Sequence, residues 1–298
     1  MKIKPKNFIT LKSNAKINLG LSVLGKRDDG YHELRMVMQT LLLYDEIFIK
    51  KIETPKIKIT SNVSWLPTNE KNLAHKAVKL LKERYNIPGG VYIDIVKEIP
   101  VAAGLGGGSA NCAAVLIGMR KLYNLNITNE RLQKIGKELG ADVPYLIMQG
   151  TVLAGGIGEK LSPLPAHPYM HVLLAKPRFS VSTADIFGAL SRYPLVDNKQ
   201  KLRNLTVAIG KKDIKGISEN VFNDLELVTA TKYPIIHDIK KTMLAHGALC
   251  SMMSGSGPTV FGYFADKKDA LAAARALRAM DIKEVILTGT FNRGAPRR

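Results

Sequence analysis

The residues with the clearest potential for chemistry lie between positions 100 and 115 of the chain. Four of the five residues from 104 to 108 are glycine, and Ser109 and a run of small residues follow them. Glycine lets successive backbone N–H groups turn toward one point, and the start of a helix adds unpaired N–H groups and the positive end of its dipole. The stretch therefore predicts a loop that binds an anion such as a phosphate.

Other interpretations of this glycine-rich loop fit less well. A flexible linker is unusual between an apolar strand, residues 91–96, and an amphipathic helix, residues 109–123. The dinucleotide-binding pattern GxGxxG needs a glycine where Ser109 stands. A Walker A pattern that begins at Gly20 needs Ser or Thr where Arg27 stands, because that hydroxyl binds magnesium. We therefore expect a phosphate loop of another type.

The elements that must position this loop are predicted from hydrophobic periodicity. Residues 8–24 predict two strands, and their alternation places Lys16, Asn18 and Gly20 on one face. A charged turn at 25–34 precedes another strand, and the lysine-rich residues 56–60 predict a short edge strand. Helices are predicted over 68–86, 109–123 and 128–139, the last with Thr128 as N-cap and Gly140 as C-cap. Residues 140–161 predict a tight turn, a strand and a glycine-rich crossing.

The second half of the chain mixes short strands with helices. Strands are predicted at 170–175, 249–253, 259–264 and 284–290, and helices at 182–190, 233–246 and 267–280, with poorly patterned basic helices up to about residue 220. This order predicts an α+β fold with an antiparallel sheet. A proline-rich change of composition at 162–168 predicts two domains, 1–161 and 162–298.

The composition is that of a globular protein, with 46% hydrophobic and 23% charged residues among 298. Two distant cysteines favour a reducing cytoplasm, and neither a signal peptide nor a membrane span is expected. The net charge of +19 permits a nucleic-acid partner, but the basic residues are spread out and no nucleic-acid-binding signature appears. The same charge would serve to attract small polyanionic substrates. It would also be expected if the cytoplasmic proteins of the source organism are basic in general.

Four separated motifs together resemble the GHMP family of small-molecule kinases. PVAAGLGGGSAN is similar to the family's phosphate loop, and MSGSGPTVFG at 253–262 to its C-terminal glycine motif. AKINLGLSVLGKRDDGYHEL at 15–34 and LGADVPYLI at 139–147 are most similar to members that act on a cytidine diphosphate-linked methylerythritol. The resemblance implies a two-domain α+β fold, with an ATP-binding domain like ribosomal S5 domain 2 followed by a ferredoxin-like substrate-binding domain.

The resemblance also implies transfer of the γ-phosphoryl group of ATP, with Mg2+, to a hydroxyl of the methylerythritol moiety. Asp142 matches the family's base, and Lys16 matches the lysine that keeps this base ionised and offsets phosphoryl charge. From spacing alone, Asp142 is more simply an N-cap or turn residue before Pro144, and Lys16 a solvated strand lysine. The resemblance favours the catalytic roles for both.

The implied nucleotide-binding residues surround the glycine loop. They are Pro100, Gly104, Leu105, Gly106, Gly107, Gly108, Ser109 and Ala110, with the Ser109 hydroxyl near phosphate or magnesium. Ser109 is also a candidate helix N-cap. Asn72 and Lys97 match positions near the nucleotide, and a capping asparagine and a helix-surface lysine are the alternatives. We expect no metal site built from protein side chains alone.

The implied substrate-binding residues include two aromatic side chains. Tyr31 would stack on cytosine, His32 would contact its edge, and Phe187 would be a second stacking ring, although a lone phenylalanine is most simply a core residue. The others are Asn18, Asp142, Thr183, Gly255 and Ser256. Residues 193–216 match nothing that we can place, so the sequence does not predict what covers the substrate.

Two alternatives remain open at this point. A GHMP kinase that acts on homoserine or a mevalonate-type acid would have the same fold, but the GYH turn at 30–32 favours a substrate that carries a base. A non-catalytic binding protein is the alternative from another class, and Lys16 together with Asp142 argues against it. The expected partner is a small-molecule substrate, with no nucleic acid and no membrane, and the expected state is a monomer or homodimer.

Overall fold

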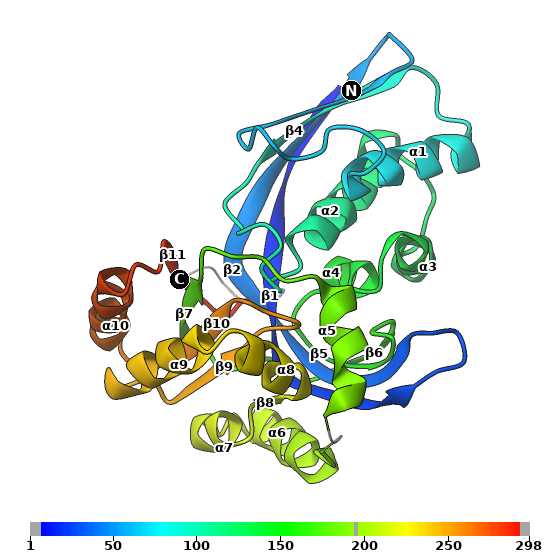
Figure 1. Cartoon of the computed structure of the whole chain (residues 1–298). Coiled ribbons are helices and arrows are strands. Elements are labelled where there is room, and N and C mark those ends of the chain that lie inside the picture. The colour runs from blue at the N-terminus through cyan, green and yellow to red at the C-terminus, as the bar shows by residue number, and fades with distance from the viewer. Residues whose placement is uncertain (1–6, 194–195, 293–298) are drawn as a thin grey trace. The chain divides into compact units, whose positions relative to one another are not determined.

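The computed structural model describes residues 7–193 and 196–292 (Figure 1). The chain forms two compact units that interleave in sequence. Unit 1 comprises Met1–Ala15, Leu43–Ile99 and Gly106–Met148, and unit 2 comprises Lys16–Leu42, Pro100–Leu105 and Gln149–Arg298. The boundary predicted between residues 161 and 162 stays a prediction.

Strands β1 (Phe8–Lys26) and β2 (His32–Ile52) are long enough to contribute to both units. The prediction of two strands over residues 8–24 is therefore wrong, because β1 is a single strand. Ser13 and Asn14, in its middle, are buried within the strand and do not form a turn. The Ser13 hydroxyl accepts a hydrogen bond of 3.0 Å from the Asn111 amide, which offsets the cost of burying this polar group.

Unit 1 places helices beside strands. β3 (Ile57–Ser61) runs parallel to β4 (Gly90–Val96), which pairs antiparallel with β2. The sheet order begins β3-β4-β2-β1, which confirms β3 as an edge strand. Helices α1 (Leu73–Tyr85) and α2 (Gly107–Leu122) lie side by side, and α3 (Asn129–Leu139) contacts α4 (Val143–Met148) (Figure 1). The sequence predicts a tight turn where α4 lies. This prediction is wrong, because Val143–Met148 form a helix.

The capping residues explain where two of these helices begin. The Thr128 hydroxyl accepts a hydrogen bond from Arg131 N, and Gly140 ends α3, so both predicted caps are confirmed. Helix α1 begins later than the predicted residue 68, because the Asn72 side chain accepts a hydrogen bond of 2.9 Å from Ala74 N and fixes the first turn there.

Unit 2 contains a separate four-stranded sheet. Its strands are β7 (His171–Lys176), β9 (Cys250–Met253), β10 (Val260–Phe264) and β11 (Glu284–Gly289), in the order β11-β7-β10-β9. All three pairings are antiparallel, which confirms the predicted sheet. In addition, β5 (Thr151–Gly156) pairs with β2 and β6 (Lys160–Pro163), and β8 (Phe222–Asn223) pairs with β1.

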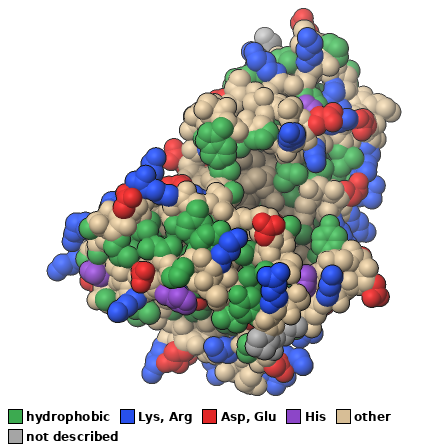
Figure 2. Space-filling model, in the orientation of Figure 1, with side chains coloured by type: hydrophobic (Ala, Val, Ile, Leu, Met, Phe, Trp, Pro, Cys, Tyr) green, Lys and Arg blue, Asp and Glu red, His purple; other side chains and the backbone are tan. Residues whose placement is uncertain are grey.

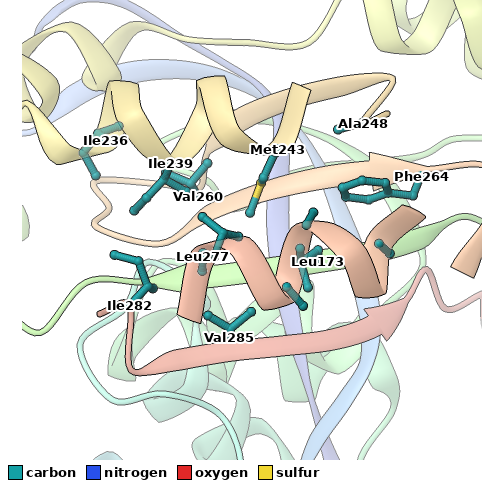
Figure 3. Packing of buried hydrophobic residues seen from close by; sticks show 14 of the residues in the cluster. Leu173, Ile236, Ile239, Met243, Ala248, Val260, Phe264, Leu277, Ile282 and Val285 are labelled. Carbon is teal, nitrogen blue, oxygen red and sulfur yellow. The ribbon is translucent and has the colours of Figure 1, made fainter. Parts of the chain in front are cut away.

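Helices α9 (Ile235–Ala245) and α10 (Lys267–Ala279) pack on this antiparallel sheet (Figure 3). Met243 of α9 and Leu277 of α10 lie over Leu173 of β7 and Val260 of β10 in one buried apolar cluster. The remaining helices of unit 2 are α5 (Thr183–Ala189), η1 (Leu190–Arg192), α6 (Lys199–Lys211), α7 (Ile214–Glu219) and α8 (Asp224–Lys232). Helix α8 is not predicted from the sequence, because its apolar residues lack a clear helical period.

The surface carries mixed charges. Lys and Arg side chains are scattered over the face shown in Figure 2, with Asp and Glu side chains among them. Among residues 7–193 and 196–292, no helix combines the length and the apolar character needed to cross a bilayer.

One buried histidine links stability to pH. His167 is 2% exposed, and its ring packs edge-on against Tyr263 with a centroid distance of 5.5 Å. Burial lowers the pKa of His167 to about 4, because the charged imidazolium would lose its hydration. The folded protein therefore keeps this ring neutral at pH values where the unfolded chain protonates it.

We expect this difference to reduce the free energy of unfolding as the pH falls below 6.5. The loss between pH 7 and pH 5 is about 2 kcal/mol from this group. Urea unfolding of the wild type and of His167→Gln at both pH values measures it, because all other titrating groups are shared. The stability difference between the two proteins should shift by that amount, and a difference that does not change with pH would rule out the effect.

Candidate active site

The backbone of the glycine loop turns through left-handed conformations before α2 begins. Gly104 has φ 76° and Gly106 has φ 71°, and Gly106 is the N-cap of α2. The helix starts at Gly107, so Ser109 is its third residue and the prediction of Ser109 as N-cap is wrong. The first hydrogen bond of the helix runs from Ala110 N to Gly106 O, at 2.8 Å. The N–H groups of the first turn are therefore without helical partners and can bind an anion.

In unit 2, the first half of this loop contacts the C-terminal glycine motif. The Ser254 hydroxyl donates a hydrogen bond of 2.9 Å to Gly104 O. A Cβ atom at Gly104 would overlap the Ser254 carbonyl oxygen. Two glycine-rich motifs separated by 150 residues thus approach closely at the backbone and are joined by a side-chain hydroxyl.

Lys16 lies beside these two glycine-rich motifs and is buried, with 5% exposure. Its Nζ donates a hydrogen bond of 2.6 Å to the Asn18 side chain, and its backbone N donates one of 3.0 Å to Leu105 O. Gly255 stands beside both side chains, since a Cβ there would lie 3.5 Å from Lys16 Nζ and 3.6 Å from Asn18 Oδ1. The interpretation of Lys16 as a solvated strand lysine is wrong.

Asn223 supports the C-terminal motif, and sequence reasoning missed it. Its side-chain amide donates hydrogen bonds of 2.8 Å to Met253 O and Gly255 O. Its side-chain oxygen caps α8 by accepting from Leu225 N at 3.0 Å. An asparagine directly before a helix was the available signal, but the uneven pattern of α8 hid it.

The predicted substrate residues of unit 2 form two further contacts. The rings of His32 and Phe187 lie 5.0 Å apart, and Phe187 is half-buried and thus not a core residue. Burial first, and the charge of Lys26 second, lower the pKa of His32, which favours the neutral ring. Tyr31 is 59% exposed. Thr183 Oγ1 lies 2.8 Å from Ser256 Oγ.

In unit 1, Asp142 stands immediately before α4. It is half-buried, and its backbone oxygen accepts a hydrogen bond of 3.0 Å from Leu146 N. Gly140, in the same motif, lies next to the phosphate loop, since a Cβ there would be 3.8 Å from Ser109 Oγ. The motif of Asp142 and the second half of the phosphate loop therefore meet within this unit.

Asn72 and Lys97 have structural partners. Asn72 caps α1, so the capping interpretation is confirmed, and its amide also donates a hydrogen bond of 2.7 Å to Pro67 O. Lys97 follows β4 and is not on a helix. Its Nζ forms a buried ion pair with Asp45, and a Cβ at Gly107 would lie 3.1 Å from that nitrogen. Their contacts with nucleotide stay predictions.

Asp45 is a second residue that sequence reasoning missed. It is fully buried, in the strand segment LLLYDEIFIK. A carboxylate among apolar strand residues was a signal, because a buried charge requires an opposite charge or several hydrogen bonds.

Comparisons with known proteins agree with these motifs. The model of the GHMP kinases N terminal domain matches residues 72–150, and that of the GHMP kinases C terminal domain matches residues 205–283. A 4-diphosphocytidyl-2-C-methyl-D-erythritol kinase from Lachnospira eligens is 47% identical over 95% of this chain and 98% of its own length. One from Caldicellulosiruptor saccharolyticus is 49% identical over 94% and 96%. The chain belongs to the GHMP kinases.

Solved structures place this GHMP kinase in the same fold. A crystal structure of 4-(cytidine 5'-diphospho)-2C-methyl-D-erythritol kinase has a TM-score of 0.79 and 30% identity, over 95% of this chain and 99% of that one. A homoserine kinase from Cytophaga hutchinsonii also has a TM-score of 0.79, with 98% and 97% covered, but at 19% identity it shows the fold alone. The predicted family and the two-domain GHMP kinase fold of the α+β class are confirmed.

The backbone geometry of the loop gives a matched pair of substitutions. We expect Gly104→Ala to lower the free energy of unfolding by about 2 kcal/mol or more, since an L residue is strained at positive φ and its Cβ would strike backbone. Gly108→Ala should be neutral or slightly stabilising, because this helical position has open space around it and alanine favours a helix. Thermal and urea unfolding of both variants measure the effects, and equal destabilisation would contradict this account of the loop.

Proposed function

We propose that this GHMP kinase phosphorylates the 2-hydroxyl of 4-diphosphocytidyl-2-C-methyl-D-erythritol with ATP, giving the 2-phosphate and ADP. This is a step in the non-mevalonate route to isoprenoid precursors. The observation that carries the proposal is the identity of 47% and 49% to kinases of this name over nearly their whole length. The motifs of the cytidine-diphosphate type, which include Tyr31, His32 and Asp142, support the same substrate.

Phosphoryl transfer depends on positioning and on neutralising charge. The N–H groups at the start of α2 and the open backbone at Gly108 are suited to hold the phosphates of ATP. Pro100, Gly104, Leu105 and Ala110 are assigned to the same nucleotide site through their places in the loop, where Gly104 makes a left-handed turn. The excess positive charge of the chain assists the capture of both polyanionic substrates.

Asp142 is assigned the role of base toward the substrate hydroxyl. Lys16 is assigned the neutralisation of charge on the transferring phosphoryl group. A buried ammonium group held by Asn18 has a fixed direction, which makes it more effective than a mobile surface lysine.

Mg2+ is expected to arrive with ATP. Within the described part of the chain, no group of three or more His, Cys, Asp or Glu side chains is suited to hold a metal ion. Mg2+ does not require such a group, because it commonly binds through substrate phosphates, waters and few protein ligands. Ser109, whose hydroxyl faces the motif of Asp142, is the residue we assign to it. When bound, the ion neutralises charge on the phosphates.

Recognition of the cytidine group is assigned to the rings of Tyr31, His32 and Phe187. The contact between the rings of His32 and Phe187 supports this assignment, because it places two ring side chains next to each other. Asn18, Thr183, Gly255 and Ser256 are assigned to the diphosphate and polyol. We further propose a cytoplasmic protein, monomeric or homodimeric, with small-molecule substrates and with neither nucleic acid nor membrane as partner.

An acceptor panel tests the proposed function. The purified protein is supplied with ATP, Mg2+ and either 4-diphosphocytidyl-2-C-methyl-D-erythritol, homoserine or mevalonate, and ADP release is followed. We expect turnover with the first acceptor alone. Asp142→Asn should lower kcat with this acceptor by about 10²-fold or more, because proton removal from the hydroxyl is lost, while ATP still binds.

Activity with homoserine or mevalonate but not with the cytidine compound would overturn the substrate assignment. Near-normal turnover by Asp142→Asn would remove this residue as the base. Calorimetry of ATP with the variant provides the control for folding and nucleotide binding.

The proposed stacking gives a separate prediction. We expect Tyr31→Ala and Phe187→Ala to raise the KM for the cytidine acceptor about tenfold, since stacking on one base contributes about 1–3 kcal/mol. The KM for ATP should stay within about twofold. Phe179→Ala is the matched control, because Phe179 is another half-buried phenylalanine of unit 2, stacked on Tyr233 at 4.1 Å. An unchanged acceptor KM in both test variants would exclude stacking.

A further inference from the structure

We propose that Asp45 is a positioning residue for the phosphate loop. Its carboxylate holds the chain that enters the loop and the helix that leaves it. The inference rests on the proposed function in one respect, namely that this loop binds ATP. All of the contacts that carry it lie within unit 1.

The first half of the argument is the chain segment before the loop. One oxygen of Asp45, Oδ1, accepts hydrogen bonds of 2.8 Å from both Glu98 N and Ile99 N. β4 ends at Val96, so this segment lies beyond the last strand pairing. The carboxylate therefore accepts the backbone hydrogen bonds that a neighbouring strand would otherwise accept. The next residue, Pro100, has no N–H group to satisfy.

A side-chain amide completes this hold. Lys97 N donates a hydrogen bond of 2.8 Å to Asn62 Oδ1, and Asn62 Nδ2 donates one of 3.2 Å to Lys97 O. Side chains thus occupy each backbone N–H group from residue 97 to residue 99. The first N–H groups left for a ligand are those of the glycine loop itself.

The second half of the argument is the helix after the loop. The other oxygen of Asp45, Oδ2, accepts a hydrogen bond of 2.7 Å from Asn111 Nδ2, in the second turn of α2. Lys97 Nζ pairs with the same oxygen, and a Cβ at Gly107 would lie 3.1 Å from this nitrogen. One buried carboxylate therefore fixes the spacing between the two ends of residues 100–106.

This arrangement matters because glycine-rich loops lose much conformational entropy when they bind a ligand. Fixing both ends in advance removes part of that cost and raises the affinity for ATP. A purely electrostatic role makes the opposite prediction. Neutralising Asp45 would then leave the charge of Lys97 uncompensated near the loop and would strengthen the binding of a polyanion.

The experiment uses Asp45→Asn, Asn111→Ala and a matched control, Asp94→Asn. Asp94 is a carboxylate of the neighbouring strand that accepts a hydrogen bond of 2.5 Å from the Thr60 hydroxyl. Calorimetry gives the Kd of ATP, steady-state kinetics give the KM of the cytidine acceptor, and amide hydrogen exchange follows residues 101–106 in the nucleotide-free protein.

We expect Asp45→Asn to raise the Kd of ATP tenfold or more and Asn111→Ala several-fold, with an acceptor KM within twofold of the wild type. Loop amides should exchange faster in both variants, and Asp94→Asn should match the wild type. If Asp45→Asn does not fold, the result for Asn111→Ala tests the proposal. This variant keeps the ion pair between Lys97 and Asp45 and both backbone hydrogen bonds to Asp45.

Unchanged or tighter ATP binding with unchanged exchange in a folded variant would overturn the role of Asp45. Failure of the wild type to bind ATP would instead overturn the proposed function. In that case the exchange rates still decide whether Asp45 and Asn111 hold the loop.

Discussion

The close approach of Gly104 to Ser254 is the contact on which the candidate site of unit 2 depends. No side chain larger than hydrogen fits at Gly104, and the Ser254 hydroxyl uses the Gly104 carbonyl as its acceptor. The neighbouring Leu105 carbonyl receives the backbone N–H of Lys16. Three distant segments of the chain are therefore joined by one side-chain hydroxyl and one backbone N–H group, both bound to backbone carbonyl oxygens of the glycine loop, and these contacts fix the strand that carries Lys16.

Polar side chains complete the hydrogen bonding where regular structure stops. Asn62 and Asp45 pair with the backbone after β4, and Asn223 pairs with the carbonyl oxygens of the C-terminal glycine motif. Buried backbone groups need such partners, and irregular segments cannot obtain them from neighbouring strands. These residues give irregular segments the hydrogen-bond partners that strands and helices find within themselves.

The fold by itself does not select a substrate. A homoserine kinase shares the architecture at 19% identity, so the acceptor must be chosen by side chains placed on the common scaffold. The N–H groups at the start of α2 can bind a phosphate, but they carry no information about the acceptor. The turn at Tyr31 and the ring pair of His32 and Phe187 lie on other segments and can change independently of them.

Local residue patterns determined much of this molecule. The glycine run predicts a phosphate loop, and Thr128 and Gly140 marked both ends of α3, because turns and caps depend on a few neighbouring residues. The order of strands and helices predicted the antiparallel sheet. The resemblance of four motifs in order identified the family and implied the roles of Lys16 and Asp142.

Tertiary structure decided the rest. β1 continues through Ser13 and Asn14 because a partner 98 residues away satisfies the serine hydroxyl. The burial of Lys16, the capping role of Gly106 and the supporting contacts of Asp45 and Asn223 likewise depend on segments that are distant in the chain. A charged or polar residue becomes a buried, directed group only when the fold brings its partners to it, and no local pattern contains that information.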